Sequence, residues 1–194
     1  MGQQESKKIK KQVQASSNQT TDDPPRGKVQ SKVKRVLLLY KADVNNKQQL
    51  DIIDAFRDEL VNAGLPLIKI KEKVNLSTVN ASSMSQDLEW LNEINNIILI
   101  RLSSDAIEDV EKIMRAKNFV NGGSLLHNKI LTVSFGKTTP PGWPPSGIKR
   151  SEGGDQKDFC FKFEDECTVT ADDFESTGAK KTLNSIVKAL AACS

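Results

Sequence analysis

The sequence predicts an α/β domain built on one mainly parallel sheet, and three observations carry this prediction. Residues 36–39 form an unbroken apolar run that is followed at once by the polar residues 41–46. A strand buried on both faces has this pattern, because helices cover both sides of a parallel sheet. A second fully apolar run occurs at residues 97–100. Strand and helix patterns also alternate about five times along the chain, which is typical of α/β proteins.

The first helix is predicted by apolar residues at three- and four-residue steps. These are Leu50, Ile53, Phe56 and Leu60. Asn45 or Asn46 can cap its start, and Gly64 is expected to form a left-handed stop after Ala63. Residues 65–70 contain Pro66 and therefore predict an edge strand. Residues 71–83 are expected to form a polar loop.

The rest of the chain predicts three further helices and two further strands. The helices are expected at residues 84–91, 107–114 and 183–190, and the strands at residues 130–135 and 159–163. Crossovers are right-handed, and the two most apolar strands should be central. The predicted strand order is therefore 2-1-3-4-5, with helices on both faces, as in a flavodoxin-like, doubly wound fold.

Composition divides the 194 residues into a tail and one domain. Residues 1–33 have almost no large apolar side chains and are predicted to be disordered, whereas residues 34–194 carry the strand and helix patterns. A net charge of +3 is too small to indicate nucleic acid binding. Three cysteines without C-x-x-C spacing and one histidine predict no metal site, and the cysteines are expected to be reduced. The absence of long apolar runs favours a cytosolic protein.

The amino terminus matches the myristoylation pattern M-G-x-x-x-[ST], with Gly2 as acceptor and Ser6 as the hydroxyl residue. Four lysines follow, at Lys7, Lys8, Lys10 and Lys11. One myristoyl chain binds membrane marginally, and each lysine adds about 1 kcal/mol near an anionic leaflet. The sequence therefore predicts peripheral attachment to the cytosolic face of a membrane, with residues 12–34 as a tether. The alternative is a chance match in a solubilising tail.

Catalytic motifs are weak in this sequence. Residues 41–46 contain no glycine, so they lack the closely spaced glycines of a phosphate-binding loop. Arg101 follows the third predicted strand, where a phospho-acceptor domain would bind Mg²⁺, and a cation opposes that ion. Ser103 or Ser104 could act with His127, but no G-x-S-x-G elbow is present. His127 is better interpreted as a loop or cap residue.

Four segments resemble TIR and SEFIR signalling domains. Residues 36–43 are similar to the family's first strand and charged loop, and residues 60–65 to the leucine, alanine and glycine that precede its second strand. Residues 91–103 resemble its third strand with the following serine, and residues 128–135, followed by prolines, resemble its fourth. The resemblance implies homotypic assembly with other TIR- or SEFIR-like proteins, which includes homo-oligomers.

Some TIR domains cleave NAD with a glutamate in a Ser…Trp-Cys-x-x-Glu run. No Trp-Cys pair follows Ser103 here, and Glu108 and Glu111 are the nearby glutamates. The resemblance therefore leaves NAD as an alternative cofactor, with Glu111 as the candidate catalytic residue near Asp43 and Ser103. The other interpretation is that these glutamates lie on a solvated helix face.

Trp143 is the candidate partner contact, together with its neighbours Pro144 and Pro145, because an aromatic ring on stiff backbone loses little entropy on binding. Its alternative is packing against the domain's own flank. The sequence thus favours a non-enzymatic, membrane-tethered signalling adaptor that needs no cofactor. The rival interpretation is an NAD-cleaving enzyme or another nucleotide-binding, flavodoxin-like protein.

Overall fold

The computed structural model describes residues 33–79, 96–116, 120–121, 124–125, 130–145, 158–166 and 168–193. In these ranges five strands form one sheet: β1 (Lys34–Tyr40), β2 (Ile68–Asn75), β3 (Asn96–Arg101), β6 (Ile130–Ser134) and β7 (Asp158–Cys160). The order is β2-β1-β3-β6-β7, and every neighbouring pair is parallel. Counted along the chain this order is 2-1-3-4-5, so the predicted flavodoxin-like fold is confirmed.

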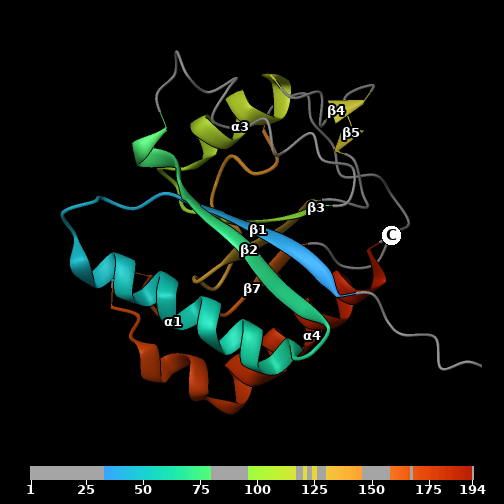
Figure 1. Ribbon diagram of the computed structural model, residues 1–194. Helices are drawn as coiled ribbons and strands as arrows, with labels where there is room; N and C mark the ends of the chain where they lie inside the picture. The colour runs from blue at the N-terminus through green and yellow to red at the C-terminus, as the bar shows by residue number, and fades with distance from the viewer. Residues whose placement is uncertain are drawn as a thin grey trace, which may run out of the picture. The chain divides into compact units, whose positions relative to one another are not determined.

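Helices cover both faces of the sheet (Figure 1). Helices α1 (Lys47–Gly64) and α4 (Thr177–Ala192) lie on one face, and α3 (Ile107–Ala116) lies on the other. Strand β1 serves both cores, because Val36 and Leu38 pack with α1 and α4 while Leu37 and Leu39 pack with α3. The continuous apolar run therefore has the physical cause that its pattern predicted.

Capping side chains set where two helices begin. The Asn46 side chain accepts a hydrogen bond from the Gln49 amide at 3.1 Å, which confirms Asn46 as the cap of α1. Ser176 does the same for α4 through the Ala179 amide. Before α4 the chain forms a short 3-10 helix, η3 (Ala171–Glu175). The predicted helix at residues 84–91 lies outside the described residues.

Five phenylalanine rings join the layers on the α1 side of the sheet. Their centroids are between 5.2 and 6.5 Å apart. The rings belong to Phe56, Phe135, Phe161, Phe163 and Phe174. Most of the pairs meet edge to face, a favourable arrangement of aromatic rings. This cluster fixes η3 and the chain after β7 against the carboxyl end of β6.

Strand β2 is longer than the sequence predicted. It begins after Pro66 and continues to Asn75, so residues 71–75 are strand and not loop. A bulge lies in the ladder, since Ile70 pairs with Val36 but Glu72 pairs with Leu37. The bulge breaks the alternation of apolar and polar residues, and lysines protect this exposed edge from other strands.

Two smaller predictions were wrong in detail, and one element was not predicted. Gly64 forms no left-handed stop, because it belongs to α1 and packs against Ile68. Strand β7 ends at Cys160 instead of residue 163, because Lys162 has a φ of 63° and turns the chain. A short antiparallel hairpin, β4 (Val120–Asn121) with β5 (Ser124–Leu125), was not predicted. Among the described helices, none has both the length and the apolar character needed to cross a membrane.

Candidate functional site

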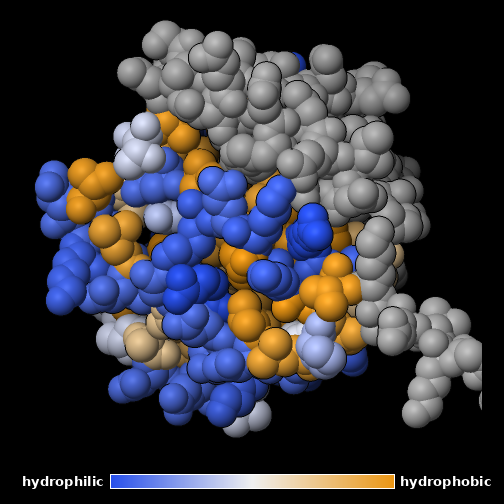
Figure 2. All heavy atoms as spheres, in the orientation of Figure 1, coloured by the Kyte–Doolittle hydropathy of each residue, from blue (hydrophilic) through white to orange (hydrophobic). Residues whose placement is uncertain are grey.

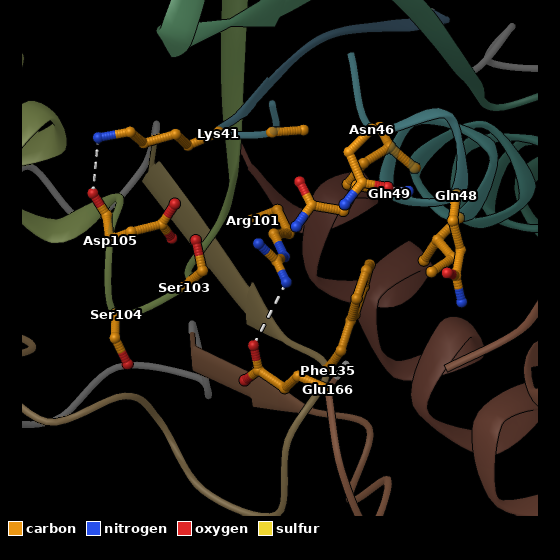
Figure 3. A pocket seen from close by; sticks show the side chains of 13 residues that line it. Lys41, Asn46, Gln48, Gln49, Arg101, Ser103, Ser104, Asp105, Phe135 and Glu166 are labelled. Carbon is orange, nitrogen blue, oxygen red and sulfur yellow. Dashed lines mark hydrogen bonds and ion pairs between the residues drawn. The ribbon is translucent and has the colours of Figure 1, made fainter. Parts of the chain in front are cut away.

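The main candidate site is a cavity of about 450 Å³ at the carboxyl edge of the sheet (Figure 3). It lies where β1 and β3 end and α1 begins. In this strand order β1 and β3 are neighbours, and the chain adds β2 on the side of β1 and then β6 and β7 on the side of β3. Ligands of doubly wound proteins bind at the point where the strand order switches sides. The polar lining includes side-chain amides, hydroxyls, two carboxylates and two cations, from Asn46, Gln48, Gln49, Ser103, Ser104, Asp105, Glu166, Lys41 and Arg101.

Asn75 holds the loop that forms one wall of this cavity. Its side chain accepts from the Ala42 amide at 3.1 Å and donates to the Ala42 carbonyl at 2.9 Å. Asp43 then closes the turn, because its side chain accepts from the Asn45 amide at 2.9 Å. These bonds give the loop a defined shape without any glycine. Asp43 was a candidate site residue, but it shapes the loop and is not part of the cavity lining.

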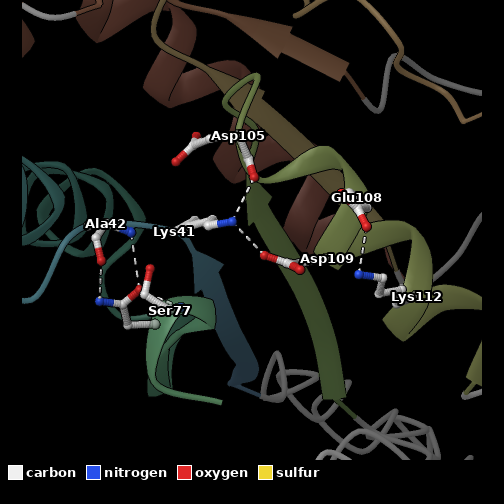
Figure 4. A network of polar contacts seen from close by, with 8 residues as sticks. Lys41, Ala42, Ser77, Asp105, Glu108, Asp109 and Lys112 are labelled. Atoms are coloured by element: carbon white, nitrogen blue, oxygen red, sulfur yellow. Dashed lines mark hydrogen bonds and ion pairs between the residues drawn. The ribbon is translucent and has the colours of Figure 1, made fainter. Parts of the chain in front are cut away.

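Lys41 ties this loop to α3 on the other side of the cavity (Figure 4). Its ammonium group contacts the Asp109 carboxylate at 2.7 Å and the Asp105 carbonyl at 2.9 Å. On the same helix Glu108 contacts Lys112 at 2.7 Å, and this hydrogen bond raises the pKa of Lys112. The contact of Lys41 with both groups fixes the distance between β1 and α3.

Arg101 forms the floor of the cavity at the end of β3. Its guanidinium group lies 5.1 Å from the centre of the Phe135 ring and 3.3 Å from the Glu166 carboxylate. The second oxygen of Glu166 accepts from the Gly136 amide at 3.2 Å. A side chain at Gly136 would collide with that carboxylate, because a Cβ there would lie 2.9 Å from Oε1. Arg101, whose charge opposes Mg²⁺ binding at this position, thus has its own structural partners.

Ser103 presents the least satisfied polar group at this site. Its side chain is only 6% exposed, and within the described ranges its hydroxyl has no hydrogen-bond partner. In Figure 3 the hydroxyl points toward the space between Lys41 and Arg101. A buried polar group without a partner costs about 1–3 kcal/mol. A ligand oxygen or nitrogen that bonds to Ser103 would recover part of that cost.

The charges around the cavity balance. Lys41 and Arg101 contribute two cations, and Asp105 and Glu166 contribute two anions. The first turn of α1 has no acidic residue, so its amino end adds a partial positive charge. The cavity therefore suits a small polar molecule that is neutral or carries a single negative charge.

The other candidate residues lie away from the cavity. Glu111 lies on α3, where it contacts Arg115 at 2.8 Å, and it is not part of the lining. The Trp143 ring packs against the core on the α3 side, and its Nε1 donates to Asp158 at 3.1 Å. Trp143 thus packs against its own domain, which is the alternative to a partner contact that the sequence left open. Pro144 is exposed and Pro145 is buried.

Several candidates lie outside the described residues. They are Gly2, Lys7, Lys8, Lys10, Lys11 and His127. Lipidation, membrane binding and partner binding therefore stay predictions. Within the described ranges, His, Cys, Asp and Glu side chains form no group of three that could hold a metal ion. Cys160 and Cys193 are free thiols.

Sequence reasoning missed the residues that shape the cavity. Asn75 was assigned to a loop, and Glu166 and Gln49 had no assigned role. No local signal marks Asn75 and Glu166, because their partners are distant in the chain, whereas Gln49 accepts from the amide of the nearby Asp43. Comparison with protein-family models, curated proteins and solved structures found no match for this chain. The resemblance to TIR and SEFIR domains accordingly stays a prediction.

Proposed function

We propose that this chain is a signalling adaptor that is tethered to the cytosolic face of a membrane and acts through protein–protein contacts of its α/β domain. The observation that carries the proposal is that one chain combines a parallel 2-1-3-4-5 sheet with a lipidation motif in its amino-terminal sequence. TIR and SEFIR domains have a sheet of this kind, as the resemblance in sequence implies. Myristate on Gly2 and the following lysines supply the two signals that stable attachment needs.

Confinement at a membrane makes weak domain contacts effective. Attachment to a membrane raises the effective concentration at which the domains meet. Contacts too weak to assemble free domains can then assemble tethered ones. The adaptor function consequently depends on location and on the domain surface, and no reaction step is required.

The position of Glu111 supports binding over NAD cleavage. This glutamate pairs with Arg115 and is absent from the cavity lining. An acid or base must come within hydrogen-bond reach of the group on which it acts. The residue that the enzymatic alternative requires thus has another partner and does not line the place where a ligand would bind.

The test uses the full chain in cells that receive a myristate analogue. We expect the wild type to be labelled and recovered with membranes, and Gly2→Ala to lose both properties. Two differently tagged copies should co-precipitate from membranes when the chain is wild type and much less when it is Gly2→Ala. An unlabelled wild type contradicts the proposal, and NAD turnover that disappears in Glu111→Ala contradicts its non-enzymatic part.

A second function is favoured by the cavity itself. Its volume lies within the range of small-molecule sites, and Ser103 supplies a buried hydroxyl that lacks a partner in the described structure. We expect NAD, which carries a single net negative charge at neutral pH, to raise the melting temperature of the full chain. Ser103→Ala should weaken that shift, whereas Ser185→Ala, an exposed control on α4, should preserve it. A shift of equal size in both variants contradicts binding at this cavity.

A further inference from the structure

We propose that the amino-terminal edge of the sheet is itself a membrane-contact surface that lies against an anionic bilayer. This inference rests on the proposed membrane attachment and adds an orientation of the domain to it. The surface is named the amino edge here and consists of Val33, Arg35, Leu65 and Lys69. These residues lie where β1 and β2 begin.

The starts of β1 and β2 are joined directly. The Lys34 amide donates to the Leu67 carbonyl at 2.8 Å, and Arg35 pairs with Lys69 in the ladder. Neighbouring strands lie about 4.8 Å apart, and paired residues of parallel strands point to the same face. The two cations are therefore side by side, and both are exposed. Within the described part of the chain neither has an ion-pair partner.

Two like charges that lie opposite each other on neighbouring strands repel each other in the free protein. An anionic headgroup between them offsets the repulsion and gains attraction from both. Basic side chains near an anionic leaflet contribute about 1 kcal/mol each. The arrangement thus favours a surface that carries many negative charges.

Apolar side chains flank these cations. Val33 is 47% exposed and Leu65 is 63% exposed, and they are two of the three large apolar residues that the described structure exposes. Figure 2 shows apolar atoms at the surface over the starts of β1 and β2 as placed in Figure 1. Surfaces that lie in the membrane interface combine exposed apolar side chains with cations. Leu65 and Val33 would enter the headgroup region while Arg35 and Lys69 contact phosphates.

The opposite edge of the sheet carries an excess of acidic residues. Six carboxylates lie on the chain after β7 and on η3, at Glu164, Asp165, Glu166, Asp172, Asp173 and Glu175, and among them Glu164 and Glu166 are paired with Lys137 and Arg101. An uneven charge distribution orients a protein as it approaches a charged surface. The domain consequently approaches with its amino edge first, and the cavity at the carboxyl edge stays open to the cytosol.

The predicted tether joins the domain at the same edge. Residue 33 precedes β1 directly, so the lipid anchor and the amino edge are linked through residues 12–32. Linked contacts strengthen each other because the second forms at a high effective concentration. Myristate, the lysines of the tail and the amino edge then act as one composite anchor.

The first test measures binding of the full, myristoylated chain to vesicles of phosphatidylcholine with phosphatidylserine. We expect Arg35→Glu with Lys69→Glu to weaken partitioning by at least about tenfold, given the contribution of two basic residues. The matched control is Lys47→Glu with Lys180→Glu, which changes the net charge equally at exposed lysines near the other edge. The control should stay within about twofold of the wild type. Equal weakening in the two pairs overturns the proposal.

A second test locates the contact and avoids a change of charge. Leu65→Trp should be quenched by lipids that carry bromine on their acyl chains, beyond the quenching seen in the wild type. Val44→Trp is the control, because Val44 is 53% exposed in the loop after β1. Circular dichroism confirms that each variant is folded. Equal quenching of the two tryptophans overturns the proposed orientation.

The two proposals fail in distinguishable ways. A wild type that binds no better than Gly2→Ala overturns the tethering function and the inference together. If the wild type binds vesicles through Gly2, but neither Arg35→Glu with Lys69→Glu nor Leu65→Ser weakens that binding, the amino edge alone is overturned. The expected result is loss of binding in each of these three variants, with the largest loss in Gly2→Ala.

Discussion

Replacement of Asn75 by alanine should destabilise the domain, because this side chain fixes the loop between β1 and the cavity. Asn75 makes three hydrogen bonds with its side chain. It bonds to the amide and the carbonyl of Ala42 at 3.1 and 2.9 Å, and it accepts from the Ser77 amide at 3.1 Å. Asn75 is buried and the bonds to Ala42 are buried as well. The alanine variant thus leaves two backbone groups of Ala42 without partners.

The expected size follows from these two groups. Each buried group that loses its partner costs about 1–3 kcal/mol. Asn75→Ala should therefore lower the free energy of unfolding by about 2–6 kcal/mol. For a domain of this size the melting temperature falls by about 2–4 °C per kcal/mol. Asn75→Asp keeps both acceptor bonds but places a carboxylate oxygen against the Ala42 carbonyl oxygen, so a loss at least as large as that of Asn75→Ala is expected at neutral pH.

Urea unfolding, followed by tryptophan fluorescence and circular dichroism, measures these differences. Asn62→Ala serves as the control, because Asn62 is exposed on α1 and a change there should stay within about 0.5 kcal/mol. The reasoning is refuted when Asn75→Ala is no less stable than Asn62→Ala.

Two further predictions concern alkaline pH and the helix glycines. Burial, with a smaller contribution from Asp54, raises the pKa of Tyr40 above its ordinary value of 10.0. The hydroxyl of Tyr40 therefore loses its proton at a higher pH in the folded state than in the unfolded state. Its contribution to the free energy of unfolding is fully present below pH 10 and is lost as the pH rises through the folded pKa. Tyr40 is the only tyrosine, so tyrosinate absorbance should titrate above pH 10 in the folded chain and near pH 10 in urea. Tyr40→Phe should lose less stability than the wild type as the pH rises above 10. Coincident titrations of the folded and unfolded chain contradict this. Gly64→Ala should destabilise by about 1–3 kcal/mol because its Cβ would lie 2.8 Å from Ile68, whereas Gly178→Ala, with open space around it, should stabilise by up to about 1 kcal/mol. Thermal unfolding compares the two, and stabilisation by both excludes the proposed clash.

The sheet could be predicted from sequence because its signals are local. The run from Val36 to Leu39 is apolar because both of its faces are covered, and α1 shows its buried face at three- and four-residue steps. The length of β2 could not be predicted in this way. Its lysines face solvent on an edge strand, and the bulge opposite Val36 shifts the alternation.

The cavity was only partly predictable. Ser103 was placed correctly at the carboxyl edge because it follows an apolar strand, whereas Glu111 was assigned by resemblance and faces another way. The contacts that shape the cavity join residues far apart in the chain, as Asn75 does with Ala42 across 33 positions and Arg101 with Glu166 across 65. No periodic pattern encodes such pairs, so they emerge only from the folded chain.

The most direct test of the proposed function is the covalent state and location of the full chain. It is co-expressed with an N-myristoyltransferase, its intact mass is measured, and its flotation with vesicles that contain phosphatidylserine is compared with that of Gly2→Ala. The proposal predicts one myristoyl group on the wild type and flotation of the wild type only. An unmodified wild type, or equal flotation of the two proteins, would contradict it.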